Sequence, residues 1–273
     1  MLSVNEIIDF FKLNNSHAKR ELGQNFLVNK DAIIDIVDAL EINENDKVME
    51  IGPGLGALTD EIINKATNYT VVEYDAKFVD FLTREYGDRK NFTVVKNNIL
   101  KVREFDGNKV IGNLPYYITT DILEHIILNY KNLERGVFMV QKECLERITA
   151  LSGKDYNAIN VVIKYLFDLK IIRKVKRDCF FPEPNVDSVV FKIEKQEKNG
   201  VSAAFLYKIA KICFSNRRKT LFNNLGNVVK DKTKVRDLLN ECKLKETARA
   251  EELSVDDFVT LSNAILKCEL IAL

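Results

Sequence analysis

Residues 48–56 read V-M-E-I-G-P-G-L-G, an apolar run interrupted by one acid and followed by closely spaced glycines. The apolar run predicts a short buried strand, and residues 53–66 predict a glycine turn that leads into a helix. Glycines at such a turn let the backbone approach a ligand where a Cβ atom would clash. The stretch therefore predicts a strand–turn–helix unit that can hold a nucleotide-like ligand.

The same alternation of strands and helices extends on both sides of this turn. Strand patterns at 48–52, 70–75, 92–98, 109–113 and the start of 136–143 alternate with helical patterns at 31–40, 76–87 and 120–130. Two further β-rich stretches, 161–175 and 187–195, flank F-F-P-E-P-N and fit an antiparallel pair. Apolar strands separated by helices are typical of a parallel sheet covered on both faces. We therefore predict an α/β, Rossmann-like fold with a mostly parallel seven-stranded sheet.

The pattern changes after Gly200, where the chain contains helical patterns and no strand pattern. The helical stretches are 203–215, 217–229, 234–244 and 254–267. The polar segment Q-E-K-N-G at 196–200 separates the two regions. The expected domains are an α/β domain over residues 1–198 and a small all-α domain over residues 199–273.

Composition excludes several classes of function. The five cysteines never occur in C-x-x-C spacing and the chain has only two histidines, so neither a metal site nor a disulfide framework is expected. No apolar run is long enough to span a membrane, and the first residues lack the features of a signal peptide. We expect a cytoplasmic protein without a membrane partner. Nothing in the pattern suggests a coiled coil, and a monomer is expected.

Positive charge is concentrated in residues 207–250, which contain twelve Lys and Arg and only four acids, although the whole chain carries a net charge of +1. A local excess of this kind is an electrostatic footprint for phosphate backbones. A solvated helical surface explains the charges equally well.

The acid Glu73 closes the 70–75 strand, 21 residues after Gly52. This spacing suits a carboxylate that binds ribose hydroxyls. A dinucleotide-binding loop would read G-x-G-x-x-G, whereas residues 52–56 read G-x-G-x-G. The shorter loop favours S-adenosylmethionine (SAM) over NAD, which leaves an NAD-dependent oxidoreductase as a disfavoured alternative. An ordinary strand–helix turn beside a surface acid is the plainer alternative.

Ligands of doubly wound sheets bind outside the carboxyl ends of the strands. Gly52, Glu73, Asn98 and Asn113 all fall at such ends, so we expect them to share one crevice. Asn113 should then lie near the reactive group of whatever Gly52 and Glu73 bind.

Asn113 also begins the tetrapeptide N-L-P-Y. Pro115 stiffens this loop and favours an extended Leu114, which would direct the Leu114 carbonyl and the Asn113 side-chain oxygen to one external point. Two acceptors at one point bind an amino group well, and Tyr116 offers a face on which a base can stack. Such a site would hold the amine of adenine and localise its lone pair. A plain strand-to-helix turn, with Asn113 as a cap and Tyr116 in the core, is the alternative.

Six segments, in order, resemble the KsgA-type ribosomal RNA adenine dimethyltransferases and, more loosely, the erythromycin-resistance methyltransferases. They are A-K-R-E-L-G-Q-N-F-L (18–27), E-I-G-P-G-L-G-A-L-T (50–59), V-V-E-Y-D (71–75), N-L-P-Y-Y-I-T-T (113–120), F-F-P-E-P-N-V-D-S-V-V (180–190) and N-R-R-K-T-L-F-N-N-L (216–225). The last segment is similar to the ribosomal branch. The resemblance implies a class I SAM-dependent methyltransferase domain. The implied activity adds two methyl groups to each of two adjacent adenosines near the 3′ end of small-subunit (16S) rRNA, in the pre-30S particle.

The resemblance also implies roles for individual residues. For the cofactor these are Gln24, Asn25, Leu27, Gly52, Gly54, Glu73, Asn98 and Asn113; for the target adenosine, Asn113, Leu114, Pro115, Tyr116 and Phe180; for RNA, Lys19, Arg20, Arg217, Arg218 and Lys219. Asn113 and Leu114 would grip the amine, while Tyr116 and Phe180 would sandwich the base. The family usually has Asp where this chain has Asn98, and we expect Asn98 to accept a hydrogen bond from the cofactor's adenine through its carbonyl oxygen.

Two alternatives remain within the same fold. One is a resistance methyltransferase that acts on large-subunit rRNA, and the other is a non-catalytic assembly factor that binds RNA.

Overall fold

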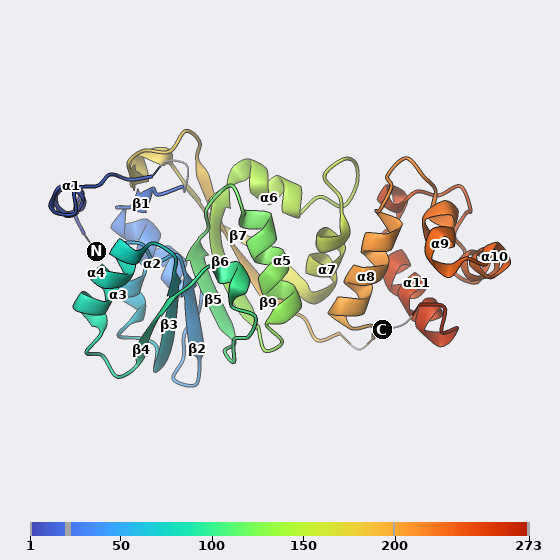
Figure 1. Ribbon diagram of the computed structural model, residues 1–273, viewed down its shortest axis with the longest axis horizontal. Coiled ribbons are helices and arrows are strands. Elements are labelled where there is room, and N and C mark those ends of the chain that lie inside the picture. The colour runs from blue at the N-terminus through green and yellow to red at the C-terminus, as the bar shows by residue number, and fades with distance from the viewer. Residues whose placement is uncertain (1, 20–22, 199, 272–273) are drawn as a thin grey trace. The chain divides into compact units, whose positions relative to one another are not determined.

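The computed structural model describes residues 2–19, 23–198 and 200–271. Its main sheet has seven strands in the order β4-β3-β2-β5-β6-β9-β7 (Figure 1). Strands β2 (Lys47–Ile51), β3 (Asn68–Glu73), β4 (Phe92–Lys96), β5 (Lys109–Asn113) and β6 (Arg135–Gln141) pair in parallel. The β9 strand (Ser188–Lys195) pairs antiparallel with β6, and β7 (Phe167–Val175) is the edge strand. The prediction of a mostly parallel seven-stranded sheet is confirmed.

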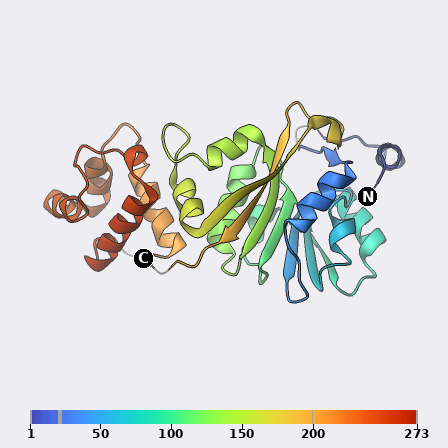
Figure 2. The same cartoon turned by 180° about the vertical axis from the view of Figure 1, so that it is seen from behind.

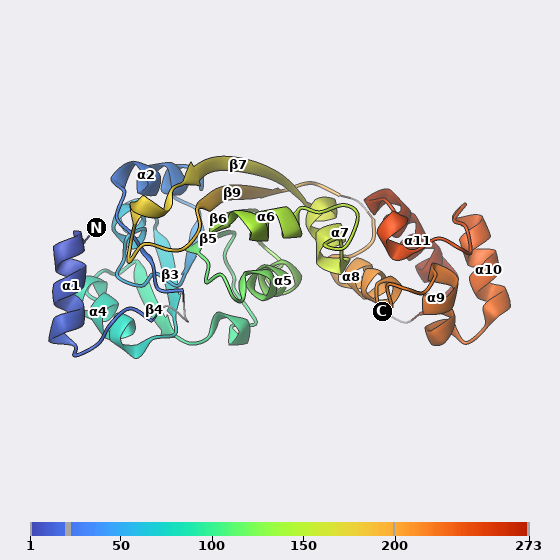
Figure 3. The same cartoon turned by 90° about the horizontal axis from the view of Figure 1, so that it is seen from above.

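Helices cover both faces of this sheet. In Figure 3, α2 (Lys30–Asp38) and α4 (Ala76–Tyr86) lie on one side and α5 (Thr119–Asn129) lies on the other, and Figure 2 shows α2 in front of the strands. Asn29 begins α2 because its side chain accepts a hydrogen bond from Ala32 N at 2.9 Å, and Asp75 caps α4 in the same way. The first turn after β2 contains the short α3 helix (Thr59–Ile62).

Two short strands, β1 (Phe26–Leu27) and β8 (Phe180–Phe181), border the carboxyl edge of the main sheet. They pair antiparallel, with Leu27 opposite Phe180. The N-terminal helix α1 (Val4–Leu13) packs its Phe10 ring against Phe78 and Phe81 of α4. Short 3₁₀ turns, η2 (Ile99–Lys101) and η3 (Arg177–Cys179), follow β4 and precede β8.

The expectation of a strand over residues 161–175 is wrong in its first part. Residues 158–166 form the α7 helix (Ala158–Leu166), and β7 begins only at Phe167. The side chain of Asn157 caps α7 by accepting from Ile159 N at 3.1 Å. Nearly every side chain of α7 is buried, and this burial outweighs the strand preference of its β-branched residues.

The chain divides into two compact units. The first contains Met1–Leu145 and Leu169–Lys195, and the second contains Glu146–Asp168 and Gln196–Leu273. The second unit includes α7 and the helices α8 (Ala203–Cys213), α9 (Leu221–Val229), α10 (Lys232–Glu241) and α11 (Val255–Lys267), with a 3₁₀ turn, η4, at Ala250–Glu252. The α6 helix (Lys142–Ile148) spans the first division. The predicted boundary after residue 198 falls close to the second division, but residues 146–168 group with the C-terminal helices.

Candidate active site

A cavity of about 420 Å³ opens at the carboxyl ends of the parallel strands in the first unit. It is lined by nine residues that the sequence singled out: Gln24, Asn25, Leu27, Gly52, Gly54, Glu73, Asn98, Asn113 and Pro115. These residues come from five separate segments of the chain. The expectation that Gly52, Glu73, Asn98 and Asn113 share one crevice is therefore met.

A hydrogen bond joins the glycine turn at residues 52–56 directly to Glu73. Gly52 and Gly54 both have positive φ, +63° and +56°, and a Cβ atom at Gly54 would lie 3.2 Å from Cε1 of Phe26. The Glu73 carboxylate accepts hydrogen bonds from the backbone of Gly54 at 3.1 Å, Tyr74 at 2.7 Å and Asp75 at 2.8 Å. Burial nonetheless raises the pKa of Glu73. These bonds fix the acid at the rim of the glycine turn.

Glu50, the acid within residues 48–56, also lines this cavity, and we did not predict it as a site residue. Glu50 is buried, and its Oε2 accepts from Thr59 Oγ1 at 2.7 Å and from the Tyr69 hydroxyl. Burial raises the pKa of Glu50 to about 7. The available signal was an acid placed inside an otherwise apolar strand.

The N-L-P-Y loop presents backbone and side-chain acceptors. Asn113 ends β5, and its Nδ2 donates to the backbone carbonyl of Asn25 at 3.3 Å. Leu114 is buried, and its N–H donates to Met139 O at 3.0 Å. Among the described residues, no hydrogen-bond donor reaches Asn113 Oδ1 or the Leu114 carbonyl. Two neighbouring acceptors therefore remain for a ligand.

The rest of the loop is held by the start of α5. The carbonyl of Pro115 accepts from Ile118 N at 3.2 Å and from Thr119 Oγ1 at 3.0 Å. Thr119 is fully buried, so this second bond is shielded from water. The loop is thus a fixed turn.

The two aromatic residues expected to sandwich a base lie outside the residues that line the cavity. Tyr116 is half-buried and its hydroxyl lies 3.0 Å from Ser188 Oγ, while Phe180 is buried in β8. Their stacking role stays a prediction. Tyr117, which we did not predict, does line the cavity, and 58% of it is exposed. The tandem tyrosines were the signal in the sequence.

The side chain of Asn98 also has a structural role. It caps η2, and its side-chain oxygen accepts from Leu100 N at 2.9 Å. An amide oxygen can accept two hydrogen bonds, so the cap leaves one acceptor position of Asn98 for a ligand. The expectation that this oxygen accepts from the cofactor stays a prediction.

The N-terminal cations expected to bind RNA are only partly described. Lys19 forms an ion pair with Asp75 at 2.9 Å, and Gln24 Nε2 lies 3.4 Å from the same carboxylate. This pairing lowers the pKa of Asp75 although burial opposes it. Arg20 lies outside the described residues.

The three C-terminal cations occupy different environments. The Arg217 guanidinium donates to the carbonyls of Tyr156 and Gly153, pairs with Glu251 at 3.6 Å and lies over the Phe214 ring. These contacts hold the guanidinium within the second unit, and the prediction that Arg217 contacts RNA stays a prediction. Arg218 and Lys219 lie exposed in the turn before α9.

A mostly parallel seven-stranded sheet, a glycine turn after its first strand and an acid at the end of the next strand define the class of SAM-dependent methyltransferases. The cavity leaves room for this cofactor beside the glycine turn, since no atom lies within 4 Å of the position where Gly52 would carry a Cβ. Among the described residues, no group of three or more His, Cys, Asp or Glu is arranged to hold a metal ion. No helix in the described ranges is long and apolar enough to span a membrane.

The chain belongs to the ribosomal RNA adenine dimethylase family, whose sequence model matches residues 15–267. It is an rRNA methyltransferase that uses SAM as the methyl donor. It is 39% identical to "Ribosomal RNA small subunit methyltransferase A" of Malacoplasma penetrans, over 94% of this chain and 95% of that protein. The protein of the same name from Fusobacterium nucleatum is 37% identical, over 89% and 96%.

Solved structures share the fold. A dimethyladenosine transferase from Plasmodium falciparum superposes with a TM-score of 0.75 at 24% identity, covering 89% of this chain and 98% of that one. The 23S rRNA methyltransferase ErmE superposes with a TM-score of 0.65 at 23% identity, covering 88% and 99%.

Proposed function

We propose that this enzyme dimethylates N6 of two adjacent adenosines near the 3′ end of small-subunit rRNA, in the immature small subunit. The name shared by its curated relatives supports the small subunit as the substrate particle. The single observation that carries the chemistry is the pair of unengaged acceptors, Asn113 Oδ1 and the Leu114 carbonyl, beside the cavity.

In the first methyl transfer of the proposed reaction, the two acceptors bind the two N–H groups of the target amine. The amine of adenine is a poor nucleophile because its lone pair is delocalised into the ring. Acceptors that hold both hydrogens favour localisation of that lone pair on nitrogen and stabilise the positive charge that develops there. Bound SAM supplies a methyl group on a positively charged sulfur, which is already a strong electrophile.

The orientation of Asn113 is central to this step. Because its Nδ2 donates to the Asn25 carbonyl, its oxygen is the atom left for the substrate. Asn25 belongs to the segment expected to bind the cofactor, so the acceptor and the cofactor segment are held together. No ionised side chain has to act as a base, since a methylated, positively charged adenine amine loses its proton readily to water.

The proposed base site uses Tyr116 and Phe180 as the two stacking surfaces. Both come from segments that border the carboxyl edge: Tyr116 follows β5, and Phe180 pairs with Leu27 across β8 and β1. Rigid positioning of the amine and base supplies a large part of the rate in such a reaction.

For RNA binding, we propose that Arg218 and Lys219 contact phosphates. Both are exposed in a stretch rich in cations. Phosphate contacts supply affinity and register but do not identify the base.

The test is methyl transfer from labelled SAM to purified small and large subunits from cells that lack this modification. We expect label only in small subunits, in two adjacent N6,N6-dimethyladenosines when the rRNA is mapped. Label in large subunits instead would identify a resistance-type methyltransferase. No label in either particle, together with tight subunit binding, would identify a non-catalytic assembly factor.

A further inference from the structure

A hydrogen bond connects the N-L-P-Y loop to a distant strand. The Tyr116 hydroxyl lies 3.0 Å from Ser188 Oγ, across 72 residues of sequence. Ser188 is 2% exposed and is the first residue of β9, where it pairs with Gln141 at the end of β6. Burial raises the pKa of Tyr116, so its hydroxyl stays protonated and able to donate.

Some buried tyrosine hydroxyls of this chain form no hydrogen bond with the described residues. The hydroxyls of Tyr156 and Tyr165 in the second unit are buried and have no hydrogen-bond partner among the described residues. The Tyr116 hydroxyl instead forms a hydrogen bond with the buried Ser188 hydroxyl, and this bond restricts the orientation of the Tyr116 side chain. The bond therefore ties the hydroxyl end of the Tyr116 ring to the start of β9.

Ser188 ends the same segment that carries Phe180. The Asp187 carboxylate, next to Ser188, accepts from Arg177 N at 3.0 Å and closes the segment into a loop. Within this loop, Phe180 pairs with Leu27, and the Cys179 carbonyl accepts from Val28 N at 2.8 Å. Ser188 thus joins Tyr116 to the frame that holds Phe180.

We propose that Ser188 is a positioning residue, whose hydroxyl holds the Tyr116 ring at the place where it stacks on the target adenine opposite Phe180. This inference rests on the proposed function, because it assigns Ser188 a part in the same base site. Ser188 itself touches neither base nor cofactor; it acts through Tyr116.

The test compares Ser188→Ala, Tyr116→Phe and the double variant in single-turnover methyl transfer to small subunits at saturating SAM. Loss of one neutral hydrogen bond predicts a fall in rate of about three- to tenfold for each single variant. The double variant should fall no further, because both changes remove the same bond. The dissociation constant of SAM should stay within twofold of wild type. Ser188→Thr, which keeps the hydroxyl, should recover most of the rate.

A second readout separates positioning from stability. RNA with 2-aminopurine at the target position should be quenched less by Ser188→Ala than by wild type, since the base stacks less well. Removing both hydroxyls leaves no orphaned polar atom, so the double variant should regain thermal stability without regaining rate. Ser262→Ala is the matched control, since Ser262 is a fully buried serine of α11 whose hydroxyl has no partner in the described chain.

The proposal is overturned if Ser188→Ala methylates at the wild-type rate, if the single losses add in the double variant, or if rate returns together with stability. Failure of the proposed function has a different signature, because the wild-type enzyme itself would then leave small-subunit adenosines unmethylated.

Discussion

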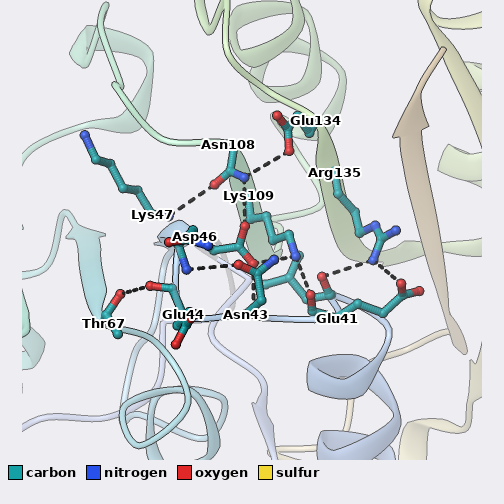
Figure 4. A network of polar contacts seen from close by, with 12 residues as sticks. Glu41, Asn43, Glu44, Asp46, Lys47, Thr67, Asn108, Lys109, Glu134 and Arg135 are labelled. Atoms are coloured by element: carbon teal, nitrogen blue, oxygen red, sulfur yellow. Dashed lines mark hydrogen bonds and ion pairs between the residues drawn. The ribbon is translucent and has the colours of Figure 1, made fainter. Parts of the chain in front are cut away.

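Strands β2, β5 and β6 begin in a network of charged and neutral polar residues that bind one another at the amino ends of the strands (Figure 4). Lys109 pairs with Asp46 at 2.6 Å, with side chains only 7% and 3% exposed, and donates to the Glu41 carbonyl. Arg135 bridges Glu41 and Glu194. At this edge the polar groups satisfy each other.

At the carboxyl edge of the same sheet, some polar groups have no hydrogen-bond partner among the described residues. The Asn113 side-chain nitrogen and the Leu114 backbone nitrogen each donate a hydrogen bond, and both residues keep an acceptor unengaged among the described residues. Completed networks stabilise a fold, whereas a polar atom that is held in place and left unpaired can bind a ligand. We therefore assign stability to the amino edge and reaction to the carboxyl edge.

The largest expected effect is at the amino edge. Lys109→Met leaves Asp46 buried without its cation and should lower the free energy of unfolding by about 3–5 kcal/mol. The matched control is Lys47→Met, because Lys47 pairs with Asp106 at 2.6 Å on the exposed surface and should cost about 0–1 kcal/mol. Urea denaturation measures both, and the methyl-transfer rate of folded Lys109→Met should equal that of wild type. Equal losses of stability for the two variants would break the comparison.

The second effect is a pH dependence at the carboxyl edge. The pKa of Glu50 is raised to about 7 in the folded chain, from about 4.5 when unfolded. The folded state therefore binds the proton more tightly, and the stabilisation that protonation gives below pH 4.5 is lost as the pH rises through 7.

Glu50→Gln removes this titration and keeps an acceptor for Thr59 and Tyr69. Between pH 5 and pH 8, the unfolding free energy of wild type should fall by about 2–3 kcal/mol relative to the variant. Denaturation curves at both pH values measure the difference. Parallel pH profiles would show that Glu50 does not titrate in this range.

The third prediction compares the stability contributions of two neighbouring arginines in the second unit, Arg217 and Arg218. Arg217 is engaged by two carbonyls and Glu251, whereas Arg218 is exposed. Arg217→Ala should lower the unfolding free energy by about 1–3 kcal/mol, and Arg218→Ala by less than about 0.5 kcal/mol. Thermal unfolding followed by circular dichroism tests this, and a reversed order would contradict it.

The smallest effect concerns RNA affinity. Reversing the charges of Arg218 and Lys219 to Glu should weaken binding to small subunits and reduce the slope of log K against log salt by about 2. Filter binding at several salt concentrations measures the slope. The control reverses Lys47 and Lys65, which changes net charge equally on the first unit. A slope that falls equally in both variants would reflect net charge alone.

The amino-acid sequence predicts the sheet well because buried parallel strands are apolar runs, and its glycine turn and acid locate the cavity. The sequence does not predict the α7 helix because its β-branched residues have the composition of a strand, and only the burial of most of its side chains makes the helix the better solution. Local composition does not contain that packing.

Side-chain partners from distant segments could not be predicted. The engagement of Arg217 by residues 153–156 and the bond between Tyr116 and Ser188 join segments more than 60 residues apart. The cap formed by the Asn98 oxygen is local, and it engages one of the two acceptor positions of that oxygen. Residue identity located these groups, and three-dimensional contacts decided which atoms stay free.

The most direct test is single-turnover methyl transfer to undermethylated small subunits by Asn113→Ala at saturating SAM, beside Asn97→Ala. Both asparagines line the cavity, but the Asn97 oxygen already accepts from Asn98 N at 2.9 Å. We expect a rate on the order of 10²-fold below wild type for Asn113→Ala, unchanged thermal stability, and a near wild-type rate for Asn97→Ala. Methylation by Asn113→Ala at the wild-type rate would contradict this expectation.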